Sequence, residues 1–178
     1  IVAKPLMLGS AYGPAGTLMV LGLFRMCFLI MLERTLSEFM RGVFKTEILR
    51  NPLLDGAIKL SGLAMVFAGF LPPWLGAGIA VALALLMLGR FFFWKPLLAC
   101  SRLDLGIMYL GYLAIAAQLL VTAFELTGGG VWIGSFSIHL FTFGVMGLII
   151  PAMIIRISRG HTGRKVMFDA LDKSILWI

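Results

Sequence analysis

Charged residues are scarce in this chain, and acidic residues are the scarcest of them. Only 13% of the 178 residues are charged, with 8 Asp and Glu against 15 Lys and Arg, while 61% are apolar. Soluble domains usually carry about 25% charged and about 45–50% apolar residues. The composition therefore excludes an ordinary soluble domain and predicts an integral membrane protein.

Cysteine and histidine are also rare, with two residues of each type. Two cysteines do not make a disulfide framework, so we expect Cys27, in a membrane span, and Cys100, in a loop, to be free thiols. The chain has no catalytic triad, no paired carboxylates within a span, no Walker-type loop and no CxxC or HExxH motif. No standard catalytic motif therefore indicates a reaction.

The apolar residues form runs long enough to cross a membrane, since a bilayer core about 30 Å thick requires about 20 apolar residues in a helix. Pro72-Pro73 and the three glycines at 128–130 interrupt these runs. We expect an all-α, polytopic transmembrane helical bundle with about five complete spans and the start of a sixth at Phe168. The five expected spans are 16–32, 57–71, 74–92, 103–125 and 131–157.

The sequence indicates a single domain. It shows no internal repeat and no soluble domain, so we treat residues 1–178 as a single transmembrane helical domain. It begins with Ile1 rather than Met, shows no signal-peptide pattern and ends in what reads as the start of another helix. We therefore expect a fragment of a longer protein.

Basic residues gather in three segments, 34–59, 90–102 and 156–173, and are missing from the turns at 72–73 and 128–130. The positive-inside rule predicts that these three segments are cytoplasmic loops and that the N-terminus lies outside. The net charge of +7 follows from this asymmetry. It indicates a lipid bilayer as partner and requires no nucleic acid.

His139 is the first candidate for chemistry, because a buried imidazole in a membrane helix is costly unless it has a function. It lies about 12 Å of helix rise into the fifth expected span, and Met146 and Met153 share its helical face. Imidazole can ligate haem iron or copper, and a thioether suits copper. Helix packing by the methionines and a hydrogen bond from the histidine to a neighbouring helix are the alternatives.

His161 lies in the expected exit loop, beside the glycines at 160 and 163 and between Arg156 and Arg164. It follows His139 by 22 positions, about 33 Å along a helix, so the two histidines cannot share one metal ion. The arginines of this segment could form a pocket for haem propionates or lipid phosphates. A simple topology signal is the alternative.

Arg25 lies near the middle of the first expected span, where an arginine costs at least about 2.5–3.5 kcal/mol. No Asp or Glu lies at the same depth, so its partner should be an anion such as a propionate, a carbonyl group or a residue outside the chain. Snorkelling to the membrane surface is the alternative. We expect Glu33 and Glu38, at the end of this span, to pair with Arg34 and Arg41.

A known family shares several of these residues. The sequence HLFTFGVMG at 139–147, followed by Met153, Arg156 and GHTGR at 160–164, resembles the signature of NnrS-family membrane proteins. Further upstream, RMCF at 25–28 followed by LERT at 32–35 resembles an arginine-plus-aromatic segment of that family. The resemblance covers nearly the whole chain.

The resemblance implies a haem- and copper-binding protein of about twelve spans in the bacterial inner membrane, of which this chain would be roughly the second half. It implies a role in nitric oxide metabolism or protection from nitrosative stress. The partners would then be a small diatomic gas such as nitric oxide and the remaining helices of the same protein. By position, His139 and His161 would be family histidines, with Arg25 and Arg164 as accompanying basic residues.

No established reaction comes with the family, so whether the protein is an enzyme stays open. Taken together, the candidate cofactor-binding residues are His139, His161, Arg25, Arg156 and Arg164, and the candidate metal ligands are His139, His161 and Met146. The alternative function is a cofactor-free transporter or scaffold in which Arg25 and His139 line a polar path. A quinol-oxidising cytochrome-like subunit is a third possibility, but it would need more histidines than the two present, which the rest of the longer protein could supply.

Overall fold

The fold was obtained as a computed structural model that describes residues 13–48, 50–129, 135–163, 168, 169, 171 and 174. Over these residues the chain is helical and contains no strand, so the expected all-α bundle is confirmed. The elements are α2 (Gly13–Phe44), α3 (Pro52–Val66), η1 (Ala68–Phe70), α4 (Pro73–Phe93), α5 (Pro96–Ala99), α6 (Leu103–Leu126), α7 (Phe136–His139), η2 (Leu140–Met146) and α8 (Gly147–His161).

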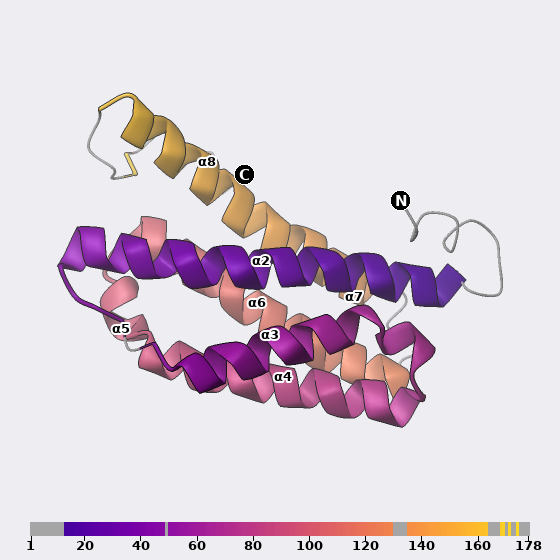
Figure 1. Cartoon of the computed structure of the whole chain (residues 1–178). Coiled ribbons are helices and arrows are strands. Elements are labelled where there is room, and N and C mark those ends of the chain that lie inside the picture. Colours follow the sequence, from indigo (N-terminus) through magenta and orange to yellow (C-terminus); the bar gives the residue numbers. More distant parts are fainter. Residues whose placement is uncertain are drawn as a thin grey trace.

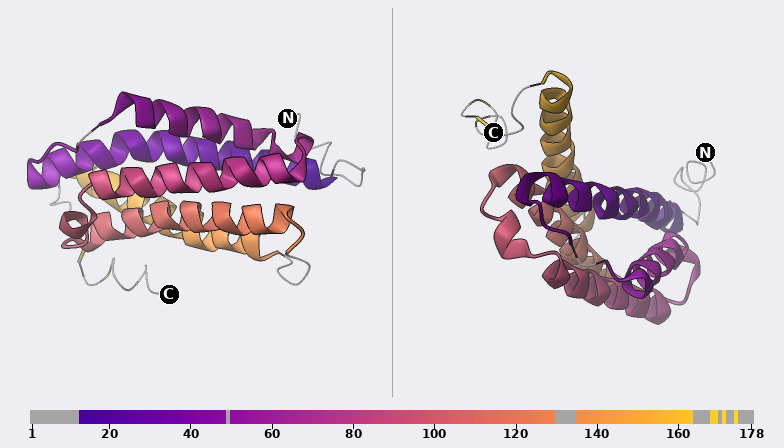
Figure 2. Two further views of the ribbon diagram at one scale, coloured as in Figure 1. Left: turned by 90° about the horizontal axis from the view of Figure 1, so that it is seen from below. Right: turned by 60° about the vertical axis from the view of Figure 1, so that its left-hand side comes forward.

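Long apolar helices dominate the bundle. Within the described ranges, four helical stretches are long and apolar enough to cross a membrane: Ala15–Phe44, Pro73–Phe93, Leu103–Leu126 and Phe136–His161. The short helix α3 packs between α2 and α4, and α4 packs against α6. Figure 1 shows α8 leaving this group of helices, and the right-hand view of Figure 2 shows the same divergence.

The helix of the first expected span is longer than the sequence predicted, because α2 continues past Leu32 to Phe44. Residues 33–44 are too polar to resemble a membrane span, but they keep apolar side chains at helical spacing. Leu36 and Met40 continue the buried stripe of Leu29 and Leu32. This periodicity is that of an amphipathic helix, and it extends α2 beyond the apolar run.

The second expected span is shifted. It was placed at 57–71, whereas α3 runs from Pro52 to Val66. The side chain of Asn51 accepts hydrogen bonds from the backbone N–H groups of Leu53 and Leu54, at 3.1 and 3.4 Å. An Asn N-cap followed by Pro at the first helical position is a strong helix start, and hydropathy does not detect it.

The boundaries of the third and fourth expected spans agree with the sequence. Helix α4 begins at Pro73 and α6 spans Leu103–Leu126, each within one residue of the prediction. The Pro72-Pro73 turn produces the expected hairpin of α3 and α4. The first residues of the fifth expected span and most of the sixth lie outside the described residues.

The three basic segments were expected to be loops, and large parts of them are helical instead. Residues 34–44 belong to α2, 52–59 to α3, 90–93 to α4 and 156–161 to α8. The helix ends that carry these segments nevertheless gather at one end of the bundle (Figures 1 and 2). Their location on the cytoplasmic side stays a prediction.

Glycine lets two helix pairs approach closely. A Cβ atom on Gly111 of α6 would lie 2.4 Å from Cγ1 of Ile149 on α8, and one on Gly22 of α2 would lie 2.7 Å from the Cα atom of Val66 in α3. Small residues at such contacts are how membrane helices gain van der Waals packing. Gly111 is therefore a point of close contact between α6 and α8.

Candidate functional site

Arg25 lies inside the bundle, where its side chain is only 2% exposed. Its Nε and Nη2 atoms both donate to Oε1 of Gln118 on α6, at 3.1 and 2.6 Å. A carbonyl group was one of the partners expected from the sequence, and the side-chain amide of Gln118 provides it. Arg25 therefore turns into the bundle and does not snorkel.

Gln118 extends this contact into a polar network that joins three helices. Its Nε2 atom donates to Oγ1 of Thr122 on α6 at 3.1 Å and to Oγ of Ser137 on α7 at 3.0 Å. All four side chains are buried. Within the described ranges no carboxylate lies within ion-pair distance of Arg25, so oriented dipoles rather than a counter-charge stabilise its guanidinium.

His139 is the last residue of α7, two positions after Ser137 of this network. Its imidazole is exposed on the surface of the described helices, contrary to the expected buried position. Its ring centroid lies 5.9 Å from that of Phe143, a side chain that is 73% exposed. Phe136 and Ile138 are also exposed, so the imidazole lies on an otherwise apolar surface.

A π-helical segment begins directly after His139. Residues 140–146 form η2, in which each backbone N–H bonds five residues back instead of four. Such segments are rare and often occur at functional sites. No sequence pattern predicted this segment, because hydropathy does not distinguish π-helix from α-helix.

The π-helix also affects the methionines that were placed on the His139 face. That placement assumed 3.6 residues per turn, and this period does not hold across 140–146. Met146 and Met153 are half-buried and pack against the core, whereas His139 is exposed. The role of Met146 as a metal ligand stays a prediction.

The expected exit loop begins later than predicted, since α8 continues to His161. Arg156 is buried in this helix, donates to Oδ2 of Asp104 on α6 and places its guanidinium 3.8 Å from the ring centroid of Phe39 on α2. Arg102 also donates to Asp104, at 3.0 and 2.9 Å. In the structure Arg156 therefore connects α8 to α6 and α2.

His161 is exposed at the end of α8, and Arg164 lies outside the described residues. His139 and His161 lie near opposite ends of one helical run, Phe136–His161, as expected from their separation. Within the described part of the chain, no three His, Cys, Asp or Glu side chains form a metal-binding group. A metal site on this chain would therefore need further ligands.

The two glutamates at the end of the first expected span differ in how well their partners were predicted. Glu38 pairs with Arg41 as expected, at 2.6 Å. Glu33 does not pair with Arg34 but with Arg50 and Lys59, at 2.8 and 3.0 Å. These partners lie 17 and 26 positions away, so local spacing could not identify them.

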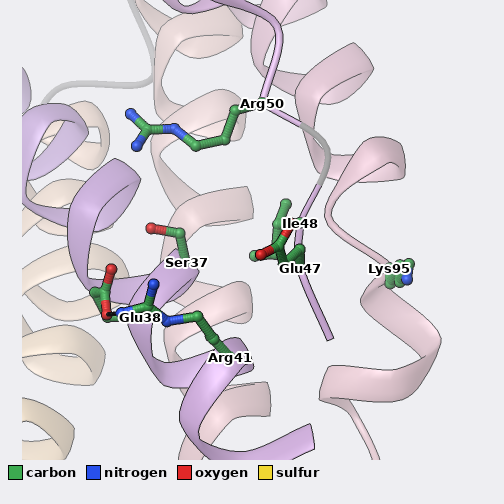
Figure 3. Close-up of a pocket in the computed structure, with 7 residues that line it drawn as sticks. All are labelled: Ser37, Glu38, Arg41, Glu47, Ile48, Arg50 and Lys95. Carbon is green, nitrogen blue, oxygen red and sulfur yellow. Dashed lines mark hydrogen bonds and ion pairs between the residues drawn. The ribbon is translucent and has the colours of Figure 1, made fainter. Parts of the chain in front are cut away.

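Arg50 also lines a pocket of about 630 Å³ at the end of α2. Figure 3 shows the ion pair of Glu38 and Arg41 on one side of this pocket and Lys95 on the other. Cationic and acidic side chains both line it, and Ile48 contributes an apolar wall. Its lining contains neither histidine nor cysteine, so it does not contribute to the expected metal site.

Comparison with known proteins identifies one family. The model of the family described as NnrS protein matches residues 2–178 of the chain. No match was found among the curated proteins, and none among the solved structures. The match includes both the Arg25 network and the helical run from His139 to His161.

Proposed function

Because the chain belongs to the NnrS family, we propose that it is a haem-binding protein of the bacterial inner membrane that takes part in nitric oxide metabolism or protection from nitrosative stress. The observation that supports this proposal best is the exposed imidazole of His139 beside Phe143, on an apolar helix surface. An imidazole facing lipid would have no hydrogen-bond partner, which favours a bound group that covers it.

His139 would hold the haem iron, and the exposed apolar side chains beside it would contact the haem ring. A haem presents a flat apolar ring with a central iron, and histidine is a common axial ligand. Phe143, Phe136 and Ile138 offer exposed apolar side chains next to the imidazole. When bound, haem would supply an iron that can take up a diatomic gas, while the protein sets access and polarity.

The Arg25 network has a supporting role in this proposal. Gln118 of α6 donates a hydrogen bond to Ser137 of α7, and His139 follows Ser137 by two residues. The network would thus fix the start of the helix that carries the ligand. Arg25 and Arg156 already have partners in Gln118 and Asp104, so binding a propionate would require either of them to exchange that partner.

The apolar surface of α8 would provide a route for the gas. Ile150, Ile154 and Ile157 are exposed and share one helical face by their spacing of four and three. A neutral diatomic molecule partitions into lipid and could reach His139 along such a surface. No charged side chain is required for this step.

The visible spectrum of the purified full-length protein tests the proposal. We expect a Soret band in the wild type, its loss in His139→Ala and its retention in Phe39→Leu, a variant of a residue that contacts Arg156 and not His139. A folded wild-type protein without a Soret band would contradict the proposal.

Copper binding is the second part of the proposal and rests on the family resemblance. His161 and Met146 are alternative candidates, because α8 separates them, and further ligands would have to come from elsewhere in the protein. Copper content per protein should fall in His161→Ala or Met146→Leu while the Soret band remains. Unchanged copper in both variants would remove these two residues from the ligand set.

The alternative function is a cofactor-free transporter, and the buried network of Arg25, Gln118, Thr122 and Ser137 favours it. Uncommon polar groups inside a membrane bundle often mark a substrate path. A colourless, folded protein that moves an anion across liposomes, and loses this activity in Arg25→Met, would support the alternative.

A further inference from the structure

Five charged residues meet where α2, α3 and α4 come together, and the proposed function does not use them. We call them the ionic cluster: Glu33, Arg50, Asp55, Lys59 and Arg90. Oε1 of Glu33 accepts hydrogen bonds from Arg50 and Lys59. Nη1 of Arg90 lies 3.6 Å from Oε2 of Glu33 and 3.3 Å from Oδ1 of Asp55.

Arg90 is held firmly in this cluster. Its Nε donates to the Tyr112 hydroxyl at 3.1 Å, and its guanidinium lies 4.5 Å from the Trp94 ring centroid. Glu33, Asp55 and Arg90 are all more than nine-tenths buried. The cluster is therefore preorganised by packing as well as by charge.

Two atoms of the cluster lack hydrogen-bond partners. Oε2 of Glu33 and Nη2 of Arg90 are buried and make no hydrogen bond within the described part of the chain. A buried polar group without a partner is costly, and such groups are rare in native proteins. Glu33 lines the pocket described next and Arg90 does not, so a ligand in that pocket that donates a hydrogen bond would satisfy Oε2 of Glu33.

A pocket opens onto this cluster. It has a volume of about 270 Å³ and is lined by Glu33, Arg50, Pro52, Asp55, Gly56 and Lys59. The two carboxylates are buried, whereas the side chains of Arg50 and Lys59 are 55% and 44% exposed. The pocket therefore has an acidic floor and a basic rim.

The position of the pocket matches the surface of a membrane. Glu33 follows directly after the apolar run of α2, and Arg90 lies in the last turn of α4. The C-terminal ends of α2 and α4 lie at the end of the bundle where the basic segments gather (Figure 1). Basic pockets between membrane helices at this level bind lipid headgroups.

We propose that this pocket binds the headgroup of a phospholipid that carries a primary amine, of the phosphoethanolamine type. The ammonium group donates to Oε2 of Glu33 and to Asp55 on the floor, and the phosphate accepts from Arg50 and Lys59 on the rim. A phosphocholine headgroup has no N–H to donate, and a phosphoglycerol headgroup has no cation for the floor. This assignment is independent of haem binding.

Native mass spectrometry of the purified full-length protein tests the proposal. The protein in detergent receives phosphatidylethanolamine, phosphatidylcholine or phosphatidylglycerol with identical acyl chains. We expect the ethanolamine lipid to bind roughly tenfold more tightly than the other two, as fits a charge-assisted hydrogen bond. Equal binding of all three lipids would overturn the proposal.

Soluble phosphoethanolamine distinguishes the source of the ligand. Weak competition by this compound means that the lipid is the ligand, because the acyl chains then contribute to binding. Competition at the same concentration as the lipid means that the pocket takes a free phosphorylated amine and not a membrane lipid, which would overturn the assignment to a lipid.

A pocket-filling variant avoids the risk that changing a buried charge unfolds the protein. A Cβ on Gly56 meets no atom within 4 Å, so Gly56→Leu should fold with every charge in place while it fills the pocket. We expect it to lose the preference for the ethanolamine lipid. Gly42→Leu is the matched control, because Gly42 is also helical and open but does not line the pocket. An undiminished preference in Gly56→Leu would overturn the proposal.

Discussion

The guanidinium of Arg25 donates two hydrogen bonds, of 3.1 and 2.6 Å, to the side-chain oxygen of Gln118, 93 positions further along the chain. The contact joins α2 to α6 in the apolar centre of the bundle. The acceptor is a neutral amide, so the cation keeps its charge without a carboxylate. The amide in turn holds Ser137 of α7, which couples three helices through one side chain.

The variant Gln118→Leu should destabilise the protein by about 2–3 kcal/mol, because it leaves the buried Arg25 without its acceptor. Equilibrium unfolding in detergent measures the change. The double variant Arg25→Met/Gln118→Leu is the control, and its loss should be smaller than the sum of the two single losses, since both partners are then removed. Additive losses would show that the two side chains are not coupled.

Asp104→Asn should loosen the C-terminal half of α8. It removes the charge that balances the buried Arg156, and breaking a buried ion pair costs about 3–5 kcal/mol. Compared with the wild type, amide hydrogen exchange should become faster in residues 150–161 and stay unchanged in α4. Such a difference would report local opening of α8. Glu38→Gln breaks an exposed pair and should change stability by at most about 1 kcal/mol. Unchanged exchange in Asp104→Asn would contradict a structural role for this pair.

A single methyl group on Gly111 should separate α6 from α8. The added Cβ would lie 2.4 Å from Ile149, and overpacking of this kind costs about 1–3 kcal/mol. The unfolding free energy of Gly111→Ala should recover partly when Ile149→Ala is added. Gly89→Ala is the comparison, because its Cβ meets no atom within 4 Å. Equal stability of the two alanine variants would show that the close approach is not present.

A disulfide should form between cysteines introduced at positions 122 and 137. The Oγ atoms of Thr122 and Ser137 are 3.3 Å apart, so Thr122→Cys and Ser137→Cys place two thiols side by side. The native Cys27 and Cys100, both free, are first replaced by alanine. Oxidation should link this pair quickly, whereas Thr122→Cys with Phe136→Cys should link slowly, because Phe136 is exposed. Similar rates for the two pairs would mean that α7 does not dock on α6 as described.

The helices that the sequence predicted well are those bounded by local signals. Pro73 starts α4, and a long apolar run defines α6, so both were placed within one residue. Helix α2 was cut short at Leu32 because hydropathy falls where Glu33 begins an amphipathic stretch. Helix α3 was placed five residues too late because its Asn51 cap lies before the apolar run.

The candidate site was predicted only in part. Arg25 was recognised as needing a partner, and a carbonyl group was among the partners named, but its identity as Gln118 was not accessible. His139 was expected to be buried, and its exposed position depends on which faces of α6 and α7 meet. Met146 does not share the helical face of His139 as expected, because a π-helix lies between them. No local residue pattern predicted this π-helix.

Composition and hydropathy alone determined that this is a helical membrane protein, because only long apolar helices satisfy both the backbone and the bilayer. The residues that resemble the NnrS family could likewise be read from the sequence. The tertiary structure decided which polar groups are paired, because the pairs join segments that are distant in the sequence. These pairs are Arg25 with Gln118, Glu33 with Arg90, and Asp104 with Arg156. These contacts depend on how the helices pack against one another. No local pattern in the sequence specifies that packing.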